Sequence, residues 1–259
     1  MKSSTLAALS ILLASSTAFA ADLRPAPVPV KAAPVAVFDW SGFYLGFNAG
    51  GGWGTNETTA NSITFKGQAV NLNELAAANN SLNGVIAGGQ VGYQYQFAGI
   101  PIVVGLEGDF DWSGIEGKGP CAQSVLVNCS ETDKLKWTAD LTGRAGYAFG
   151  PFLPYFKGGI AWGDWSHDAR VPVGNLNGGN DFIDGSLDKV RTGWLLGAGL
   201  EYGITDHISA KLEYNFLDFG STSENVSFSG PSLGGQTGSI NASFKDQVHV
   251  FKGGVNYRF

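Results

Sequence analysis

Charged residues and histidines are both scarce in this sequence of 259 residues. Asp, Glu, Lys and Arg together make up 15% of the chain, and the formal net charge is −6. A chain that binds nucleic acid is expected to be basic, so the composition argues against that class. The three histidines, His167, His207 and His249, are widely separated, which indicates neither a histidine-ligated metal nor a Ser/His/Asp constellation. We therefore expect no metal site and no enzyme.

Long hydrophobic runs are missing too. One short apolar stretch spans 6–13, after Lys2 and before Ala18-Phe19-Ala20. A positive start, a short apolar core and a small-x-small site are typical of a signal peptide, so we predict one over 1–20. No later stretch approaches the roughly 18 apolar residues that a spanning helix needs. If the mature chain lies in a bilayer, it should cross as a β-barrel.

The next segment, 21–38, is rich in alanine, valine and proline, with Pro25, Pro27, Pro29 and Pro34. Proline removes the amide donor that a strand needs. We expect an extended periplasmic lead-in here, and a single barrel domain over 39–259.

Cysteine is nearly absent, with only Cys121 and Cys129, separated by a short polar segment. In an exported chain we expect them to form a disulfide that closes a surface loop. Such a bond typically contributes about 2–4 kcal/mol. Zinc binding by this pair is disfavoured, because zinc sites use closer cysteines and no histidine lies nearby.

Glycine and short alternating stretches are what the sequence has in abundance. Apolar and wet positions alternate with a period of two, as in strands with two different faces. Short turns alternate with long polar segments, which is typical of a transmembrane barrel. We predict an all-β fold, an eight-stranded antiparallel up-and-down transmembrane barrel with short periplasmic turns and four long extracellular loops. The predicted strands are 41–54, 83–97, 102–112, 135–149, 152–162, 190–202, 208–216 and 244–259, and the predicted loops are 55–82, 113–134, 163–189 and 220–243.

Two soluble folds are alternatives, a lipocalin-like barrel and a secreted two-sheet sandwich. A lipocalin-like barrel would bury the aromatic face and expose a face of mixed charges. The wet face is mostly glycine, alanine and serine, which fits a narrow interior better. Aromatic residues gather near the strand ends, as two membrane interfaces require. They are Phe43, Trp53, Tyr95, Phe97, Trp112, Trp137, Tyr147, Phe149, Phe152, Trp162, Tyr202, Tyr257 and Phe259.

Charges on the wet faces are predicted to form a network in the lumen. Eight strands enclose an interior just wide enough for side chains, so these charges should pair across it. They would then act as a polar plug, or alternatively line a continuous ion path. The predicted network is Glu107, Asp109, Asp111, Lys136, Asp140, Arg144, Lys157, Arg191, Glu201, Lys211, Glu213, Lys252 and Arg258.

Two further patterns suggest ligands. Asp109-Phe110-Asp111-Trp112-Ser113-Gly114 resembles the start of a calcium loop, but the required acidic twelfth position is Pro120, so we discount it. Trp165, His167 and Phe182 fall in the predicted third loop and suggest a flat ligand such as haem. A solvated loop rich in glycine and asparagine explains them equally well.

Several motifs resemble the small outer-membrane surface-antigen barrels of alphaproteobacteria. They are Trp40-Ser41-Gly42-Phe43-Tyr44-Leu45-Gly46, Asn48-Ala49-Gly50, Trp53-Gly54, Gly88-Gly89-Gln90-Val91-Gly92-Tyr93-Gln94 and Tyr257-Arg258-Phe259. The last strand, with Phe251, Val255, Tyr257 and Phe259 on one face, resembles the signal that the barrel-insertion machinery recognises. The resemblance implies an immunogenic, porin-like surface protein linked to envelope integrity, and some relatives bind haemin.

We therefore expect a monomeric outer-membrane barrel with a structural and surface-antigen role. The expected partners are outer-membrane lipid, lipopolysaccharide, the insertion machinery and host surface molecules. A porin-like channel for small solutes and a haem-binding surface receptor are the alternative functions.

Overall fold

The structure is a computed structural model that describes residues 38–65, 68–120, 130–174, 181–229 and 237–259. The predicted signal peptide, nearly all of the lead-in and the predicted Cys121–Cys129 disulfide lie outside these ranges. No helix that could cross a membrane occurs among the described residues.

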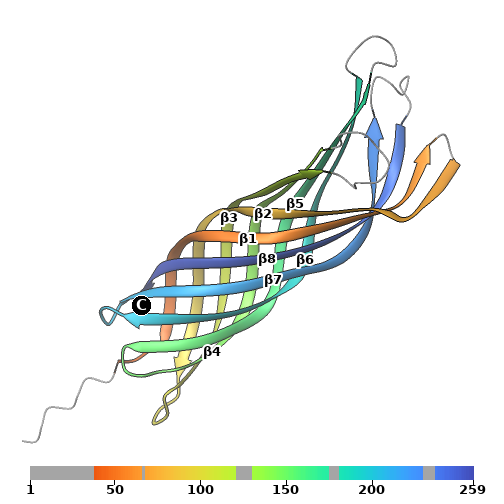
Figure 1. Cartoon of the computed structure of the whole chain (residues 1–259). Coiled ribbons are helices and arrows are strands. Elements are labelled where there is room, and N and C mark those ends of the chain that lie inside the picture. Colours follow the sequence, from red (N-terminus) through yellow and green to blue (C-terminus); the bar gives the residue numbers. More distant parts are fainter. Residues whose placement is uncertain (1–37, 66–67, 121–129, 175–180, 230–236) are drawn as a thin grey trace, which may run out of the picture. The chain divides into compact units, whose positions relative to one another are not determined.

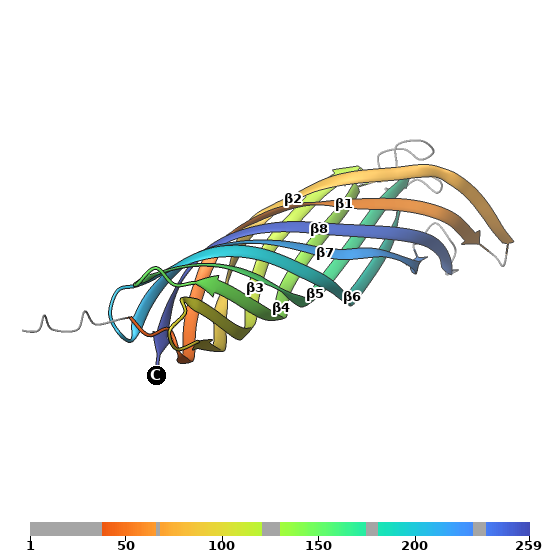
Figure 2. The ribbon, with the colours of Figure 1, turned by 90° about the horizontal axis from the view of Figure 1, so that it is seen from below.

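The described residues form eight antiparallel strands that close into a barrel (Figure 1). Each strand pairs with its sequence neighbours, and β1 pairs with β8. Figure 2 shows this ring from below. The predicted fold class is confirmed. The strands are β1 (Gly42–Phe65), β2 (Gln68–Gln96), β3 (Ile102–Pro120), β4 (Ser130–Tyr147), β5 (Phe152–Gly174), β6 (Asp181–Gly203), β7 (Ile208–Ser229) and β8 (Thr237–Arg258).

The outer surface carries a broad apolar belt. On β1, Phe43, Leu45 and Phe47 point outward, while Tyr44 and Asn48, at the alternate positions, are buried inside. The same alternation holds on the other strands, because successive side chains point to opposite faces of a sheet. Exposed aromatic and aliphatic side chains over such an area fit a lipid environment better than water.

Three short turns lie at one end of the barrel, which we call the turn end. Between β2 and β3, Gly99 takes a positive φ of 79°, and the Phe97 amide donates to the Ile102 carbonyl at 3.1 Å. Between β4 and β5, Gly150 has a φ of 62°. Glycine adopts these backbone angles without steric cost. The predicted short turns are confirmed, and β8 also ends at the turn end (Figure 1).

The predicted long loops are mostly strand, so those boundaries were wrong. The β1–β2 ladder continues from Gly54 and Leu82 out to Phe65 and Gln68, through most of the segment expected to be a loop. Beyond the belt the outer face meets water instead of lipid. Its side chains become polar, and the apolar contrast that marks a strand fades while the backbone ladder continues.

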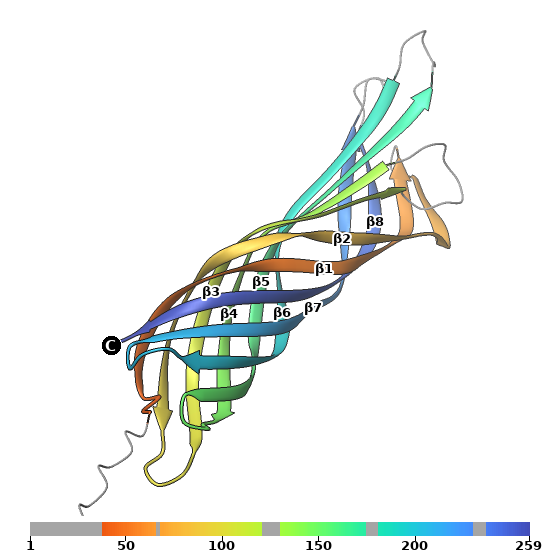
Figure 3. The same cartoon turned by 60° about the vertical axis from the view of Figure 1, so that its left-hand side comes forward.

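The opposite end, which we call the far end, separates into two sheets (Figure 3). The pairing of β2 with β3 stops at Asn83 and Glu116. The pairing of β6 with β7 is interrupted between Trp194 and Gly185. Beyond these points, β7–β8–β1–β2 pair as one sheet and β3–β4–β5–β6 pair as the other. The two sheets are joined again near their tips, where Asp184 and Gly185 of β6 pair with β7.

The interior is filled by side chains in successive layers. Inward positions of β8, read from the turn end, are Asn256, Lys252, Val250, Val248 and Asp246. They pass from polar through apolar to polar again, and the other strands follow the same order. The layers begin with an apolar cap at the turn end, formed by Phe38, Trp40, Val103, Ala148, Leu153 and Tyr155. Beyond the charged residues lies an apolar layer, formed by Leu82, Ile86, Ile115, Leu135, Ala161, Trp165, Leu195, Leu217, Phe219, Val248 and Val250.

Candidate functional site

Between the turn-end cap and the apolar layer, strands from around the ring project ionised side chains inward. We call this set the charged layer: Glu107, Asp109, Asp111, Asp140, Arg144, Lys157, Glu201, Lys211, Glu213 and Lys252, all buried. Each falls on the wet face of its strand, so the period of two brings them together. Arg191 and Arg258, also expected in the network, are buried in neighbouring layers instead.

Lys136 was predicted to face the lumen, and that prediction was wrong. The pairing of β4 with β5 shifts register between Leu135 and Trp137. This bulge adds one residue, so the parity of inward positions changes. The Lys136 ammonium points outward and contacts Asp188 at 2.7 Å, with both side chains exposed.

Glu107 lies at the centre of the charged layer. Its carboxylate accepts from Lys157 at 2.9 Å, from Arg144 at 3.1 Å and from Lys211 at 3.3 Å. The Tyr44 hydroxyl donates to it as well, at 2.7 Å. Charges so far from water are tolerated only when they are paired and hydrogen-bonded.

The other charges extend the network to both sides. Lys157 bonds Asp109 at 3.0 Å and Glu213 at 3.1 Å. Lys252 bonds Asp109 at 2.8 Å and Asp111 at 3.0 Å. The network therefore links β3, β5, β7 and β8 across the lumen.

Arg144 on β4 carries the network towards the turn end. One guanidinium nitrogen donates to Glu201 at 2.7 Å, and the group lies 3.9 Å from the centroid of the Tyr155 ring. Glu201 also accepts from Ser209 at 2.5 Å and from Asn256 at 2.9 Å. At this end of the layer, an ion pair, a cation–π contact and hydrogen bonds from Ser209 and Asn256 therefore hold Arg144 and Glu201 in place.

Two tyrosines of the network were missed by the sequence analysis. Tyr44 and Tyr155 occupy wet-face positions and donate to Glu107 and Glu213, each at 2.7 Å. A Cβ at Gly92 would collide with the Tyr44 ring, and one at Gly199 with the Tyr155 ring. The glycine paired with each tyrosine on the adjacent strand leaves room for the ring. A large side chain with a polar tip on an otherwise glycine-rich face was the sequence feature that could have predicted these two residues.

Water has no access to the centre of this layer. The side chains of Glu107, Lys157, Lys211 and Glu213 have 0% exposure. A conducting pore would leave the side chains around its path in contact with water. The charged layer is instead a packed plug between two apolar layers.

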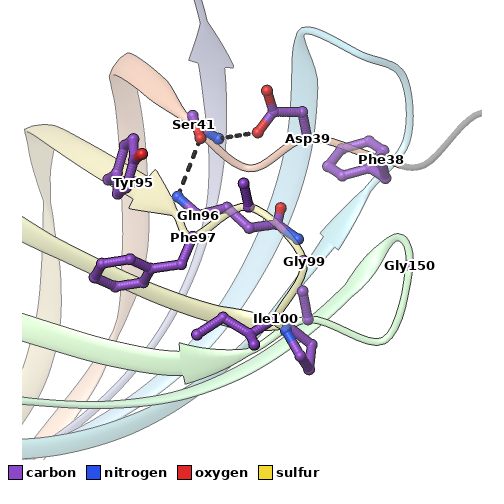
Figure 4. A pocket seen from close by; sticks show the side chains of 12 residues that line it. Phe38, Asp39, Ser41, Tyr95, Gln96, Phe97, Gly99, Ile100 and Gly150 are labelled. Atoms are coloured by element: carbon purple, nitrogen blue, oxygen red, sulfur yellow. Dashed lines mark hydrogen bonds between the residues drawn. The ribbon is translucent and has the colours of Figure 1, made fainter.

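The turn end is closed by residues that precede β1. Trp40 is fully buried, and its indole nitrogen donates to the Gly150 carbonyl at 3.0 Å. The Arg258 guanidinium lies over the rings of Phe38 and Trp40. Figure 4 shows the neighbouring pocket, where the Ser41 hydroxyl accepts a hydrogen bond from the backbone amide of Gln96 at 3.0 Å. These contacts fix the cap across the mouth of the lumen.

A second polar group lies beyond the apolar layer, towards the far end. We call it the upper cluster: Asn56, Asn80, Glu131, Asp133, His167, Arg191 and Asp246, all buried. Arg191 forms an ion pair with Asp246. His167 Nδ1 lies 2.7 Å from Asp133 Oδ1. Glu131, Asp133 and His167 bring candidate metal-ligating atoms within 4.8 Å of one another.

Trp165 and His167 were expected in a solvated loop, and this was wrong. Both lie on β5 and point into the barrel, where Trp165 is fully buried. The His167 ring stacks on Phe244 with a centroid distance of 4.4 Å. The side chain of Phe182 lies outside the described residues.

Burial changes the titration of the upper cluster, which lies outside the apolar belt. Burial, together with the neighbouring Asp133 carboxylate, raises the pKa of Glu131 to about 7, although His167 partly opposes this. Burial likewise raises the pKa of Asp246, against the opposing charges of His167 and Arg191. Desolvation of a carboxylate favours its neutral form.

The predicted insertion-signal residues on β8 face outward. Phe251, Val255, Tyr257 and Phe259 are all exposed on the apolar belt. Tyr257 and Phe259 are in edge-to-face contact, with centroids 5.1 Å apart. Tyr257 and Phe259 lie at the turn end, where β8 ends.

A closed ring of strands with an apolar outside and an ionised, filled inside defines a transmembrane β-barrel. The chain belongs to the family described as outer membrane protein beta-barrel domain, whose model matches residues 6–259. It is an outer-membrane protein, so the turn end faces the periplasm.

Known relatives agree with this assignment. The chain is 30% identical over 264 residues to the 31 kDa outer-membrane immunogenic protein of Brucella melitensis, covering 100% of both chains. It is 28% identical to the 22 kDa outer membrane protein of Rhizobium leguminosarum over 74% of this chain and 68% of the relative. The outer membrane protease OmpT of Escherichia coli superposes with a TM-score of 0.53 at 8% identity, covering 84% of this chain and 97% of that one. That last likeness concerns the fold alone.

Proposed function

We propose that the protein is a sealed barrel whose role is structural, stabilising the outer membrane and displaying its far end at the cell surface. The observation that carries this proposal is the charged layer, in which the central acids and bases have no contact with water. A barrel plugged by ion pairs can anchor and brace, but it gives ions no wet path.

The apolar belt and the charged layer would each serve a different part of this structural role. The apolar belt holds the barrel in lipid, and the charged layer ties opposite strands together across the lumen. Lys157, for example, contacts carboxylates on both β3 and β7. Because removing one member of a buried ion pair leaves its partner uncompensated, the network favours one fixed barrel geometry.

Surface display is supported by the strands that continue past the belt and by the names of relatives. The 31 kDa protein of Brucella melitensis is called immunogenic, which fits exposure to a host. We propose outer-membrane lipid, lipopolysaccharide and host surface molecules as partners, and the insertion machinery as the reader of the β8 outer face. We propose that the chain acts as a monomer without enzymatic activity.

A haem receptor is less well supported. His167, the residue expected to reach haem, is buried and hydrogen-bonded to Asp133. An axial ligand has to present its nitrogen to a large flat ring, and this imidazole lies inside the barrel, stacked on the Phe244 ring with centroids 4.4 Å apart.

Deletion of the gene in its source bacterium tests the proposal. We expect greater sensitivity to detergents and to large hydrophobic antibiotics, restored by the wild-type gene. Uptake of small hydrophilic solutes should be unchanged by the deletion. Slower solute uptake with an intact detergent barrier would contradict a structural role and favour a channel.

A further inference from the structure

We propose that Glu131, Asp133 and His167, with Asn80 beside them, form a binding site for a divalent transition-metal cation of the zinc class at the far end of the barrel. The site lies outside the charged layer, and it would add cation binding to a structural barrel.

The donor atoms have almost the spacing that a metal needs. One atom each from Glu131, Asp133 and His167 lie within 4.8 Å of one another. Around zinc, with bonds of about 2.0–2.2 Å, neighbouring tetrahedral ligands lie about 3.3–3.6 Å apart. Closing the set requires these atoms to approach one another by about 1 Å.

Asn80 is the second, independent observation. Its side chain is buried, and the Nδ2 atom lies 3.0 Å from Asp133 Oδ2 and 3.4 Å from Glu131 Oε2. Both are hydrogen bonds that the Asn80 amide donates to the carboxylates. Its Oδ1 atom has no hydrogen-bond partner among the described residues.

The orientation of that amide depends on what lies between the carboxylates. With no cation, Nδ2 must face Glu131 and Asp133, and the Oδ1 acceptor is left buried without a donor, which is costly. A half-turn of the Asn80 amide would direct Oδ1 at the same point. That orientation is repulsive beside two bare carboxylates and favourable beside a cation.

The charges of the upper cluster also favour a cation. Among its described members, Glu131, Asp133 and Asp246 are acidic, and Arg191 is the one permanent cation. Arg191 is bonded to Asp246 and to the Phe244 carbonyl, on the other side of the cluster. Asp133 contacts the His167 imidazole at 2.7 Å, and neither Glu131 nor Asp133 has a lysine or arginine partner among the described residues.

The donor set selects the kind of metal. Two carboxylates and one imidazole, with an amide oxygen as a fourth group, suit zinc and its transition-metal neighbours. A calcium site would use oxygen ligands alone and more of them. The His167 Nε2 atom is buried and has no partner among the described residues either.

The location gives the site a consequence for the fold. Asn80 lies on β2, in one sheet of the far end, whereas Glu131, Asp133 and His167 lie on β4 and β5 in the other. A bound cation would join the two sheets just beyond the point where the ladder between β2 and β3 ends.

Equilibrium dialysis tests the site directly. The full chain is refolded in detergent, stripped with EDTA and dialysed against zinc chloride, and the bound metal is measured by mass spectrometry. We expect one zinc per chain. His167→Ala, Asp133→Asn and Glu131→Gln should each weaken binding by about tenfold or more, and Asn80→Asp should strengthen it.

Matched controls use the other histidines. His207 lies in an exposed turn and His249 on the outer face, with Nδ1 2.7 Å from the Tyr214 hydroxyl. His207→Ala and His249→Ala should bind zinc like wild type. Heat-modifiable gel migration confirms that each variant is folded.

Three outcomes would overturn the proposal. They are a folded wild-type chain that holds no zinc above the buffer level, zinc binding that survives His167→Ala but fails in His249→Ala, and preference for calcium over zinc. Cobalt substitution needs no variant, and visible absorption bands of imidazole and carboxylate coordination are the expected result. Their absence from a cobalt-saturated sample would contradict the site.

Discussion

The charged layer and the upper cluster are both buried, mixed and multi-stranded, yet they differ in balance. In the charged layer each cation contacts at least two carboxylates, as Arg144 contacts Glu107 and Glu201. In the upper cluster Asp133 contacts the His167 imidazole, Arg191 pairs with Asp246, and Glu131 has no cationic contact among the described residues. A balanced layer is complete without a ligand, whereas an acid-rich one has capacity for a cation. Both sets are buried, so burial alone does not tell which of them has capacity for a cation.

Removing the central acid should have the largest effect on stability. Glu107→Gln keeps the shape but leaves Lys157, Lys211 and Arg144 without their shared counter-charge. Loss of one partner from a buried ion pair costs about 3–5 kcal/mol. Urea unfolding of the refolded barrel, followed by tryptophan fluorescence, measures this loss. A change below about 1 kcal/mol would mean that the layer is not what holds the strands together.

The upper cluster should make the free energy of unfolding of the metal-free protein depend on pH. Burial and the Asp133 charge raise the pKa of Glu131 to about 7, against about 4.3 for an unfolded chain. The folded state then binds more protons in this window, so stability falls as the pH rises from about 4.3 to 7. The expected loss is about 3–4 kcal/mol, since each pKa unit is worth about 1.4 kcal/mol.

Urea unfolding in EDTA across that pH range measures the slope. Asp133, His167 and Asp246 also act on the Glu131 carboxyl. The informative quantity is therefore the difference from Glu131→Gln, which should lose the slope due to this carboxyl. An unchanged slope in Glu131→Gln would assign the titration to another group.

The turn-end cap should matter less than either cluster. Trp40→Phe keeps a ring between Phe38 and Val103 but removes the donor to the Gly150 carbonyl. The hydrogen bond and the lost volume together should cost about 1–2 kcal/mol. Ion conductance should stay absent, because the charged layer seals the lumen independently of the cap. A conducting Trp40→Phe barrel would place the seal in the cap instead.

The smallest effect is expected on the outer surface. Lys136 and Asp188 form an exposed ion pair, and exposed pairs are typically worth about 0–1 kcal/mol. Lys136→Gln should therefore leave urea unfolding nearly unchanged, and it serves as the surface control for Glu107→Gln. A loss as large as that of Glu107→Gln would contradict the placement of Lys136 outside the lumen.

The sequence carries the fold and much of the lumen because side chains alternate strictly in a strand. That period places Glu107, Lys157 and Glu213 inward without knowledge of the partner strands. It failed at Lys136 because a bulge changes the parity, and nothing local in the sequence marks that bulge.

The upper cluster was missed for a different reason. Beyond the belt the outer face becomes polar, so the contrast that indicates a strand is weak, and Glu131 and Asp133 were assigned to a loop. Their approach to His167 and Asn80 depends on pairings between β4 and β5 and on the meeting of two sheets. These contacts exist only once the ring has closed.

The central claim is that the lumen is sealed, and single-channel recording in planar bilayers tests it most directly. Heat-modifiable gel migration shows first that the refolded protein is a barrel. We predict no discrete channel openings from the folded wild-type chain at moderate voltage and salt. Steady, reproducible channels of one conductance, with an ion selectivity that changes in Glu107→Gln, would contradict the account.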